Sequence, residues 1–189
     1  MPPFNQLRQI IEGISPLSDS AWEILASICE ELTFQKGDYL LKEEAVCEHI
    51  WFLNAGCCKA SLDKEGKEFN LDFFFEGDFF THVASLSRSS PSDYSLIAIE
   101  KGIAIRIPKV DLLQAYSSSH EIEAFGRKFL QKLLSEQEQR ATDLRVLSPT
   151  ERYEKLLQRE PALLQRVSLT QLASYLGISR ETLSRIRAK

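Results

Sequence analysis

Long apolar runs are absent from this sequence. It has no stretch of about 18 consecutive apolar residues, so we expect no membrane-spanning helix. The opening, MPPFNQLRQII, lacks the basic-then-apolar order of a secretory signal, and a cytoplasmic protein is therefore predicted. Cysteine is scarce, and the spacing of Cys29, Cys47, Cys57 and Cys58 matches no zinc-binding pattern. We therefore expect free thiols and predict neither a metal site nor a resident cofactor.

A strong excess of one charge is also absent, because the formal net charge is only -4, but the charges are unevenly distributed. Of the 23 Lys and Arg residues, ten lie in residues 140–189, together with only five of the 27 Asp and Glu residues. The chain therefore has a basic end on an acidic body. This arrangement is typical of a protein that binds an anionic partner, although a basic cluster can also be a solvated face.

The apolar pattern divides the chain into a helical part, a strand-rich part and a second helical part. Residues 4–30 hold two amphipathic segments, the second capped by Ser18. Between residues 32 and 107, short apolar runs are separated by turn residues, and residues 63–66 predict a hairpin. This spacing is typical of a sandwich or barrel. A short helix is expected from Pro108 to Tyr116.

A long amphipathic helix is predicted from His120 to about Leu147. A helix of this length cannot bury its whole apolar stripe in a local core. Two copies packed along it are therefore favoured over the alternative, in which the helix lies across the strand-rich part. The stripe recurs at three- and four-residue steps and consists of Ile122, Phe125, Phe129, Leu133, Leu134, Ala141 and Leu144.

The remaining residues contain repeated helix-start signals. Ser148-Pro149-Thr150 predicts a helix to about residue 159, and Pro161 precedes a short linker helix. A capping box of Ser168 and Gln171 begins a further helix over residues 169–176.

A second short helix follows directly. Gly177 suits the left-handed turn that ends the first helix, and Ser179 caps the next one. Ala173 is small where the two helices must approach closely. The pattern predicts a helix-turn-helix whose buried contact is formed by Leu172, Leu176, Ile178, Leu183 and Ile186.

The outward face of the last helix predicts a DNA-reading surface. Arginine matches guanine in a bidentate pair, and a carboxylate accepts from cytosine, whereas hydroxyl groups near helix N-termini suit phosphate contacts. The alternative, a simple surface ion pair between Glu181 and Arg185, explains only two of these residues. The predicted DNA-binding residues are Arg180, Glu181, Ser184, Arg185, Arg187, Ser179, Thr170 and Thr182.

The stretches GDYLLKEEAVCEHIWFLNAG, FFFEGDFF and LGISRETLSRIRAK resemble the Crp/Fnr family of bacterial transcription regulators, and the compact chain is similar to the short Bacteroidetes-type branch. The resemblance implies an α+β fold with a double-stranded β-helix (jelly-roll) sensor domain of cyclic-nucleotide-binding type. It divides the chain into that sensor domain (1–118), a dimerisation helix (119–147) and a helix-turn-helix domain (148–189).

The resemblance also implies partners. These are a second copy of the chain, a palindromic double-stranded DNA site and RNA polymerase. In the family, the positions that match Arg180, Glu181 and Arg185 read guanine and cytosine.

The sequence departs from the family pattern for cyclic nucleotides. His82 and Val83 stand near the place of the family's ribose-binding glutamate. Ser92-Asp93-Tyr94 stands at the place of its phosphate-binding arginine, where a carboxylate would repel phosphate. We therefore predict no tight binding of cyclic AMP, and an unknown small-molecule effector, or none, takes its place. The residues expected to line the ligand pocket are Phe75, Phe80, His82, Ser85, Tyr94 and Phe129.

Other functions find less support in the sequence. His82, Ser85 and Asp93 are residue types of a catalytic triad, but no nucleophile elbow surrounds Ser85, so no enzyme is predicted. The family's haem branch makes His82 a candidate ligand, although a single histidine by a turn is more often structural. The main alternative is a dimeric small-molecule-binding protein whose helix-turn-helix docks proteins instead of DNA.

Overall fold

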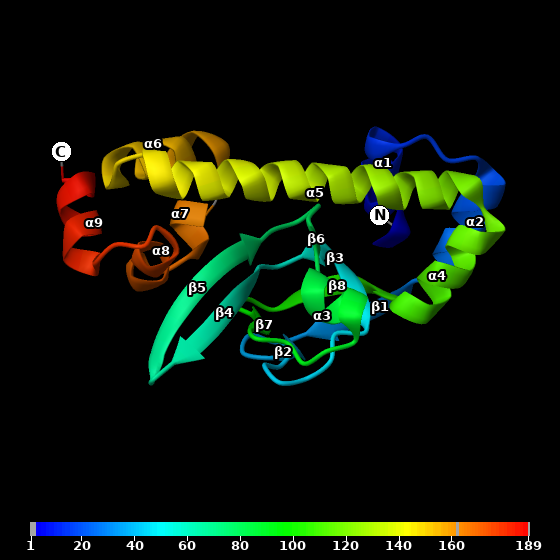
Figure 1. The fold of residues 1–189 in the computed structure, drawn as a ribbon, viewed down its shortest axis with the longest axis horizontal. Coiled ribbons are helices and arrows are strands. Elements are labelled where there is room, and N and C mark those ends of the chain that lie inside the picture. Colours follow the sequence, from blue (N-terminus) through cyan, green and yellow to red (C-terminus); the bar gives the residue numbers. More distant parts are fainter. Residues whose placement is uncertain (1–2, 162, 189) are drawn as a thin grey trace.

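The computed structural model describes residues 3–161 and 163–188. Its longest element is helix α5, His120–Val146, which runs along one side of the molecule (Figure 1). A strand-rich body lies beside the first part of α5, and shorter helices gather at its far end. The helix thus has almost the predicted length. Ser119 caps it, since the Ser119 hydroxyl accepts the N–H of Ile122.

The N-terminal helices α1, Pro3–Ile14, and α2, Asp19–Ser27, pack beside the first half of α5. Ser18 caps α2 as predicted, because its hydroxyl accepts the N–H of Ala21. A carboxylate oxygen of Glu121 in α5 also accepts the backbone N–H of Ser18 at 2.5 Å. This contact ties the first helices to α5.

Within the described residues, two four-stranded antiparallel sheets form a β-roll, with strand orders β1-β8-β3-β6 and β2-β7-β4-β5. The mixed α+β fold with an N-terminal β-roll is therefore confirmed. The strands are β1 (Glu30–Phe34), β2 (Tyr39–Leu41), β3 (His49–Ala55), β4 (Cys58–Lys64), β5 (Lys67–Phe74), β6 (Phe79–Phe80), β7 (Ser95–Ala98) and β8 (Gly102–Pro108).

The two sheets enclose an apolar core. Alternate residues of a strand point to the same face of its sheet. Leu53 and Leu96, one from each sheet, are fully buried in this core. The Phe80 ring stacks between Trp51 and Phe74, with centroid distances of 5.8 and 4.8 Å. A second apolar cluster, which includes Phe52, Phe125 and Ile122, joins the roll to α1, α2 and α5.

The predicted hairpin connects β4 and β5. Lys64 pairs with Lys67, and the two residues between them, Glu65 and Gly66, have φ angles of 57° and 76°. Positive φ at both positions is typical of the tightest hairpin turns. Because β5 lies at the end of its sheet, its outer edge is free to meet the C-terminal helices.

Two helices of the strand-rich region differ from the sequence prediction. α3, Val83–Arg88, was not predicted; its N-terminus is capped by the ring of His82, a residue that signals helix starts only weakly. α4, Lys109–Ser118, continues two residues past the predicted end at Tyr116, and Pro108 is its N-cap instead of its first residue.

The C-terminal helices are α6, Pro149–Arg159, α7, Leu163–Arg166, α8, Leu169–Tyr175, and α9, Arg180–Arg187. They form one apolar cluster that also contains Phe73 of β5, so this unit packs on the β-roll. None of the helices in the described residues is both long and apolar enough to cross a membrane.

Candidate nucleic-acid interface and ligand cavity

The helix-turn-helix forms through local hydrogen bonds. Ser168 and Gln171 make the predicted capping box, each side chain accepting a backbone N–H of the other residue. Gly177 has a φ of 67°, and the N–H of Ile178 then bonds the carbonyl of Ala173 at 3.0 Å. The hydroxyl of Ser179 accepts the N–H of Thr182 at 3.1 Å and begins α9.

Helix α9 has one buried face and one exposed face. Leu183 is fully buried against α8, and Ile186 is half-buried. Figure 1 shows α9 as the outermost helix of the C-terminal unit, away from the β-roll. The predicted DNA-binding side chains are exposed except Thr182, which is half-buried; the exposed ones are Thr170, Ser179, Arg180, Glu181, Ser184, Arg185 and Arg187.

The exposed face of α9 carries charges of both signs. A hydrogen bond from its own backbone N–H, followed by one from Ser179, lowers the pKa of Glu181. Its carboxylate is therefore ionised and available as an acceptor. Arg185 donates to the hydroxyl of Thr182 at 3.3 Å and is otherwise exposed, so both guanidinium groups of Arg180 and Arg185 face outward with Glu181.

Helix α8 packs its other side against β5. The hydroxyl of Ser174 accepts the backbone N–H of Asn70 at 2.9 Å and donates to the carbonyl of Glu68 at 3.3 Å. The Tyr175 ring meets the edge of Phe73, with centroids 5.5 Å apart. These contacts cover the free edge of β5.

Two ion-pair groups strengthen this junction. Arg166 of α7 binds Glu76 at 2.7 Å and Glu100 at 2.5 Å, and its guanidinium lies 5.2 Å from the Phe75 ring centroid. These carboxylates raise the pKa of Arg166, with the hydrogen bonds to Glu100 contributing most. Arg140 of α5 pairs with Asp72 of β5 in the same junction.

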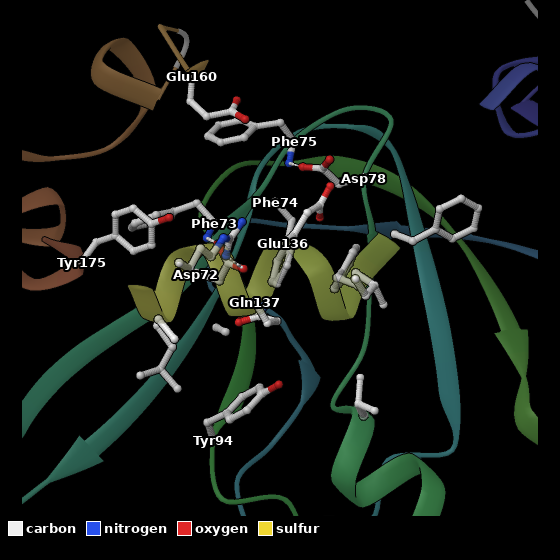
Figure 2. Close-up of a pocket in the computed structure, with 18 of the residues that line it drawn as sticks. Asp72, Phe73, Phe74, Phe75, Asp78, Tyr94, Glu136, Gln137, Glu160 and Tyr175 are labelled. Atoms are coloured by element: carbon white, nitrogen blue, oxygen red, sulfur yellow. Dashed lines mark hydrogen bonds and ion pairs between the residues drawn. The ribbon is translucent and has the colours of Figure 1, made fainter. Parts of the chain in front are cut away.

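A cavity of about 750 Å³ lies between the β-roll, α5 and the C-terminal helices (Figure 2). This volume is within the range of small-molecule sites. Five of the six residues predicted for a ligand pocket line it, namely Phe75, Phe80, His82, Tyr94 and Phe129.

Ser85 is the exception and corrects the prediction. It is a fully buried residue of α3, and its hydroxyl donates to the carbonyl of Ser90 at 2.5 Å and accepts the N–H of Cys47 at 2.8 Å. Both hydrogen-bonding roles of the hydroxyl are used in holding the loop. Ser85 therefore does not reach a ligand and is not placed as a nucleophile.

Both ring nitrogens of His82 are engaged. Nδ1 accepts the N–H of Ser85 at 3.0 Å, so Nε2 carries the proton and donates to Asp93 at 2.5 Å. The ring also stacks on Tyr94, with centroids 4.1 Å apart. The hydrogen bond from His82 lowers the pKa of Asp93, which keeps a negative charge at the cavity wall.

Sequence reasoning missed several residues of this cavity. The roll contributes Asp72 and Asp78, α5 contributes Glu136 and Arg140, and the C-terminal unit contributes Glu160 and Tyr175, among others. No local pattern marks them, because they come from three separate parts of the chain and meet only in the fold. Figure 2 shows the carboxylate side chains among the aromatic rings of β5 and its following turn.

Among the residues that the structure describes, no group of three or more His, Cys, Asp or Glu side chains could hold a metal ion. Burial raises the pKa of the Cys29 thiol to about 12, and it raises the pKa of Cys58 equally. These thiols are therefore protonated and unreactive.

Comparison with known proteins identifies the domain and the fold. Residues 31–119 match the family model of the cyclic nucleotide-binding domain. No curated protein was found to match the chain.

Three solved structures show what the fold resembles. The catabolite activator protein of Thermus thermophilus is 17% identical, with a TM-score of 0.59, over 100% of this chain and 85% of that one. CLP of Xanthomonas campestris, described as a c-di-GMP responsive global regulator, is 19% identical, with a TM-score of 0.67, over 90% of each chain. A chain from Eubacterium rectale, assigned to the crp/fnr family of transcriptional regulators, is 17% identical, with a TM-score of 0.69, over 90% of this chain and 82% of that one.

Proposed function

We propose that this chain, which has the fold of the Crp/Fnr transcriptional regulators and contains a cyclic nucleotide-binding domain, is a sequence-specific DNA-binding regulator that acts as a homodimer. We further propose that cyclic AMP is not its effector. Contact with RNA polymerase and a cytoplasmic location are part of the same proposal.

The exposed face of α9 carries this proposal. The first residues of a recognition helix enter the major groove, where arginine and glutamate distinguish guanine and cytosine. Arg180 and Glu181 are the first two residues of α9, and Arg185 follows just over one turn later, while Leu183 anchors the opposite face. A helix with one charged, exposed face and one buried, apolar face can enter a groove while its buried face stays packed on the rest of the domain.

The apolar stripe of α5 supports the homodimer. Its first half packs on the β-roll, but Leu130 is 54% exposed and Leu134 is 63% exposed. Leu144 is also exposed, on the same side of the helix as these two residues. Large apolar side chains spread over several turns of one helix are typical of a helix–helix interface.

The His82–Asp93 pair supports the insensitivity to cyclic AMP. The two side chains bind each other where the family places groups that hold the ribose and the cyclic phosphate. Asp93 is ionised and its side chain is 85% exposed, so it repels a phosphate instead of attracting it.

The test is DNA selection from random sequence followed by band-shift titration. Arg180→Ala and Arg185→Ala should each lose about 1–3 kcal/mol of binding free energy on the selected site and relax the preference at one base. Arg88→Ala removes an equally exposed arginine from the β-roll and serves as the control. Unchanged affinity and base preference in both α9 variants would contradict base reading.

A salt titration separates the two candidate partners. Binding through DNA phosphates loses affinity steeply as the salt concentration rises. Docking of a protein on an apolar surface would change little. A flat salt dependence would favour the protein-docking alternative.

A further inference from the structure

The carboxylates of the cavity are not balanced by its cations. Asp78 accepts the backbone N–H of Phe75 at 2.8 Å, and neither Asp78 nor Glu160 forms an ion pair with a described side chain. Among the described side chains, Glu136 forms an ion pair with Lys132 alone, at 3.9 Å. Desolvation, with repulsion by Glu160 and Asp72, raises the pKa of Asp78 to about 6, although the Phe75 N–H and the charge of Arg140 act in the opposite direction.

Two of the three Arg and Lys side chains of the same lining are paired with carboxylates. Arg140 pairs with Asp72, and Lys155 bonds Asp143 at 2.7 Å. Arg152 donates to the carbonyls of Leu147, at 2.9 Å, and Leu176, at 3.1 Å, but it forms no ion pair with a described carboxylate, and its buried Nε has no partner. His82 is held by Asp93. The lining holds six carboxylates against three Arg and Lys side chains, so it favours a cation over a phosphate.

The remaining surface of the cavity is largely apolar, with aromatic rings among aliphatic side chains such as Leu133 and Leu156. Phe74, Phe75, Phe129 and Tyr94 line it between the carboxylates, and Figure 2 shows Phe75 in the same region as Asp78 and Glu160. Aromatic faces attract cations and also bury apolar groups. A metal ion does not suit this lining, because the described carboxylates do not converge into a group that could ligate one.

We propose that this cavity binds an organic amine with an apolar body, whose ammonium group is held by Asp78 and Glu160 and whose body lies on Phe75 and Phe129. Asp78 belongs to the β-roll, whereas Glu160 follows α6 in the C-terminal unit, so one ammonium group joins the two parts. The ligand thereby stabilises this placement of the helix-turn-helix. The regulatory consequence rests on the proposed function, but the binding itself does not.

The binding test uses isothermal titration calorimetry of the purified full chain without DNA. The probes are 4-phenylbutylamine, its isosteric alcohol 4-phenylbutanol, the anion 4-phenylbutyrate, and cyclic AMP. The amine should bind more tightly than the alcohol, and both anions should bind weakest. No detectable amine binding at millimolar concentration, equal binding of amine and alcohol, or tighter binding of either anion would each overturn the proposal.

Matched variants locate the ammonium group. Asp78→Asn and Glu160→Gln should each weaken the amine by about tenfold or more, as expected for the loss of a charge-assisted hydrogen bond. The binding of the alcohol should not change. Glu31→Gln, at an exposed residue of β1 that does not line the cavity, should leave both unchanged. Amine binding that is insensitive to Asp78→Asn and Glu160→Gln would overturn the assignment.

A separate band-shift assay distinguishes this inference from the proposed function. The wild-type chain is titrated with selected DNA in the presence and absence of the amine. Amine binding without DNA binding contradicts the regulator and leaves the amine site standing. DNA binding without amine binding does the reverse.

Discussion

At the scale of single residues, backbone conformation decides the helix-turn-helix. Gly177 lies in the left-handed region, and no side chain crowds the position where a Cβ would stand. Glycine is therefore required at this position for its backbone conformation and not for lack of space. A residue with a Cβ must carry the cost of the left-handed backbone at this turn.

We expect Gly177→Ala to lower the free energy of unfolding by about 1–2 kcal/mol, because alanine strains the turn. Gly13→Ala is the control, since Gly13 lies in α1 with equally free surroundings and no positive φ. Alanine there should raise stability by up to about 1 kcal/mol. Urea denaturation measures both, and equal effects of the two variants would contradict the argument.

The pH dependence of stability reports on Asp78. Its folded pKa of about 6 lies above the usual carboxyl value, so its contribution to stability is complete at low pH and is lost as the pH rises through 6. The charged groups around it are Asp72 of β5, Glu160 after α6 and Arg140 of α5. The Asp78→Asn variant should therefore gain stability relative to the wild type between pH 4.5 and pH 7, as measured by denaturation at each pH. A constant difference would show that Asp78 does not titrate there.

At the scale of elements, the contact of α8 and α7 with the β-roll joins two parts of the chain that each have their own core. Ser174 satisfies the edge of β5, and Arg166 holds Glu76 and Glu100 together. The side chain of Arg166 is only 23% exposed, so its charge is shielded from water. Removal of that charge leaves two carboxylates facing each other.

Arg166→Met should destabilise the junction by about 1–3 kcal/mol, as expected when charged hydrogen bonds are lost from a partly buried site. Hydrogen exchange of the Asn70 amide, which Ser174 protects, should become faster. Arg8→Met removes an arginine that pairs with Glu12 and Asp19 on the surface, and exchange at Asn70 should be unchanged in it. Unchanged protection in Arg166→Met would show that the ion pairs do not hold α8 on β5.

At the scale of the whole molecule, the proposed dimer depends on the exposed apolar residues in the second half of α5. A single copy leaves its apolar residues in water, whereas a second copy packed along the helix would bury them. The dimer would also present two α9 helices together, which a palindromic DNA site requires.

Leu134→Asp should convert a dimer into a monomer in sedimentation equilibrium, because a charge would then face the partner helix. Val110→Asp places the same charge at a residue of α4 that is 74% exposed. That control should remain dimeric. A wild-type chain that is monomeric at all concentrations would contradict the dimer, and a dimeric Leu134→Asp would place the interface elsewhere.

Most of the secondary structure and the whole helix-turn-helix could be predicted from the sequence, because the forces that form them act over a few residues. The caps at Ser18, Ser168 and Ser179 join groups three positions apart, and the Glu65-Gly66 turn joins adjacent strands. Such interactions depend little on the rest of the fold. The outward face of α9 follows directly, since helical periodicity separates Arg180 and Arg185 from Leu183.

The charged residues of the cavity and the domain junction could not be predicted, because they depend on packing between distant segments. Arg166 meets Glu76 across 90 residues, and Ser174 meets Asn70 across 104. Ser85 was predicted to line the pocket, yet its hydroxyl both donates to and accepts from the backbone of the surrounding loops. Local patterns therefore specified which segments become helices, strands and caps. The packing of β5 against α5 and α8 determined which carboxylates face one another, because long-range contacts depend on the relative placement of completed elements.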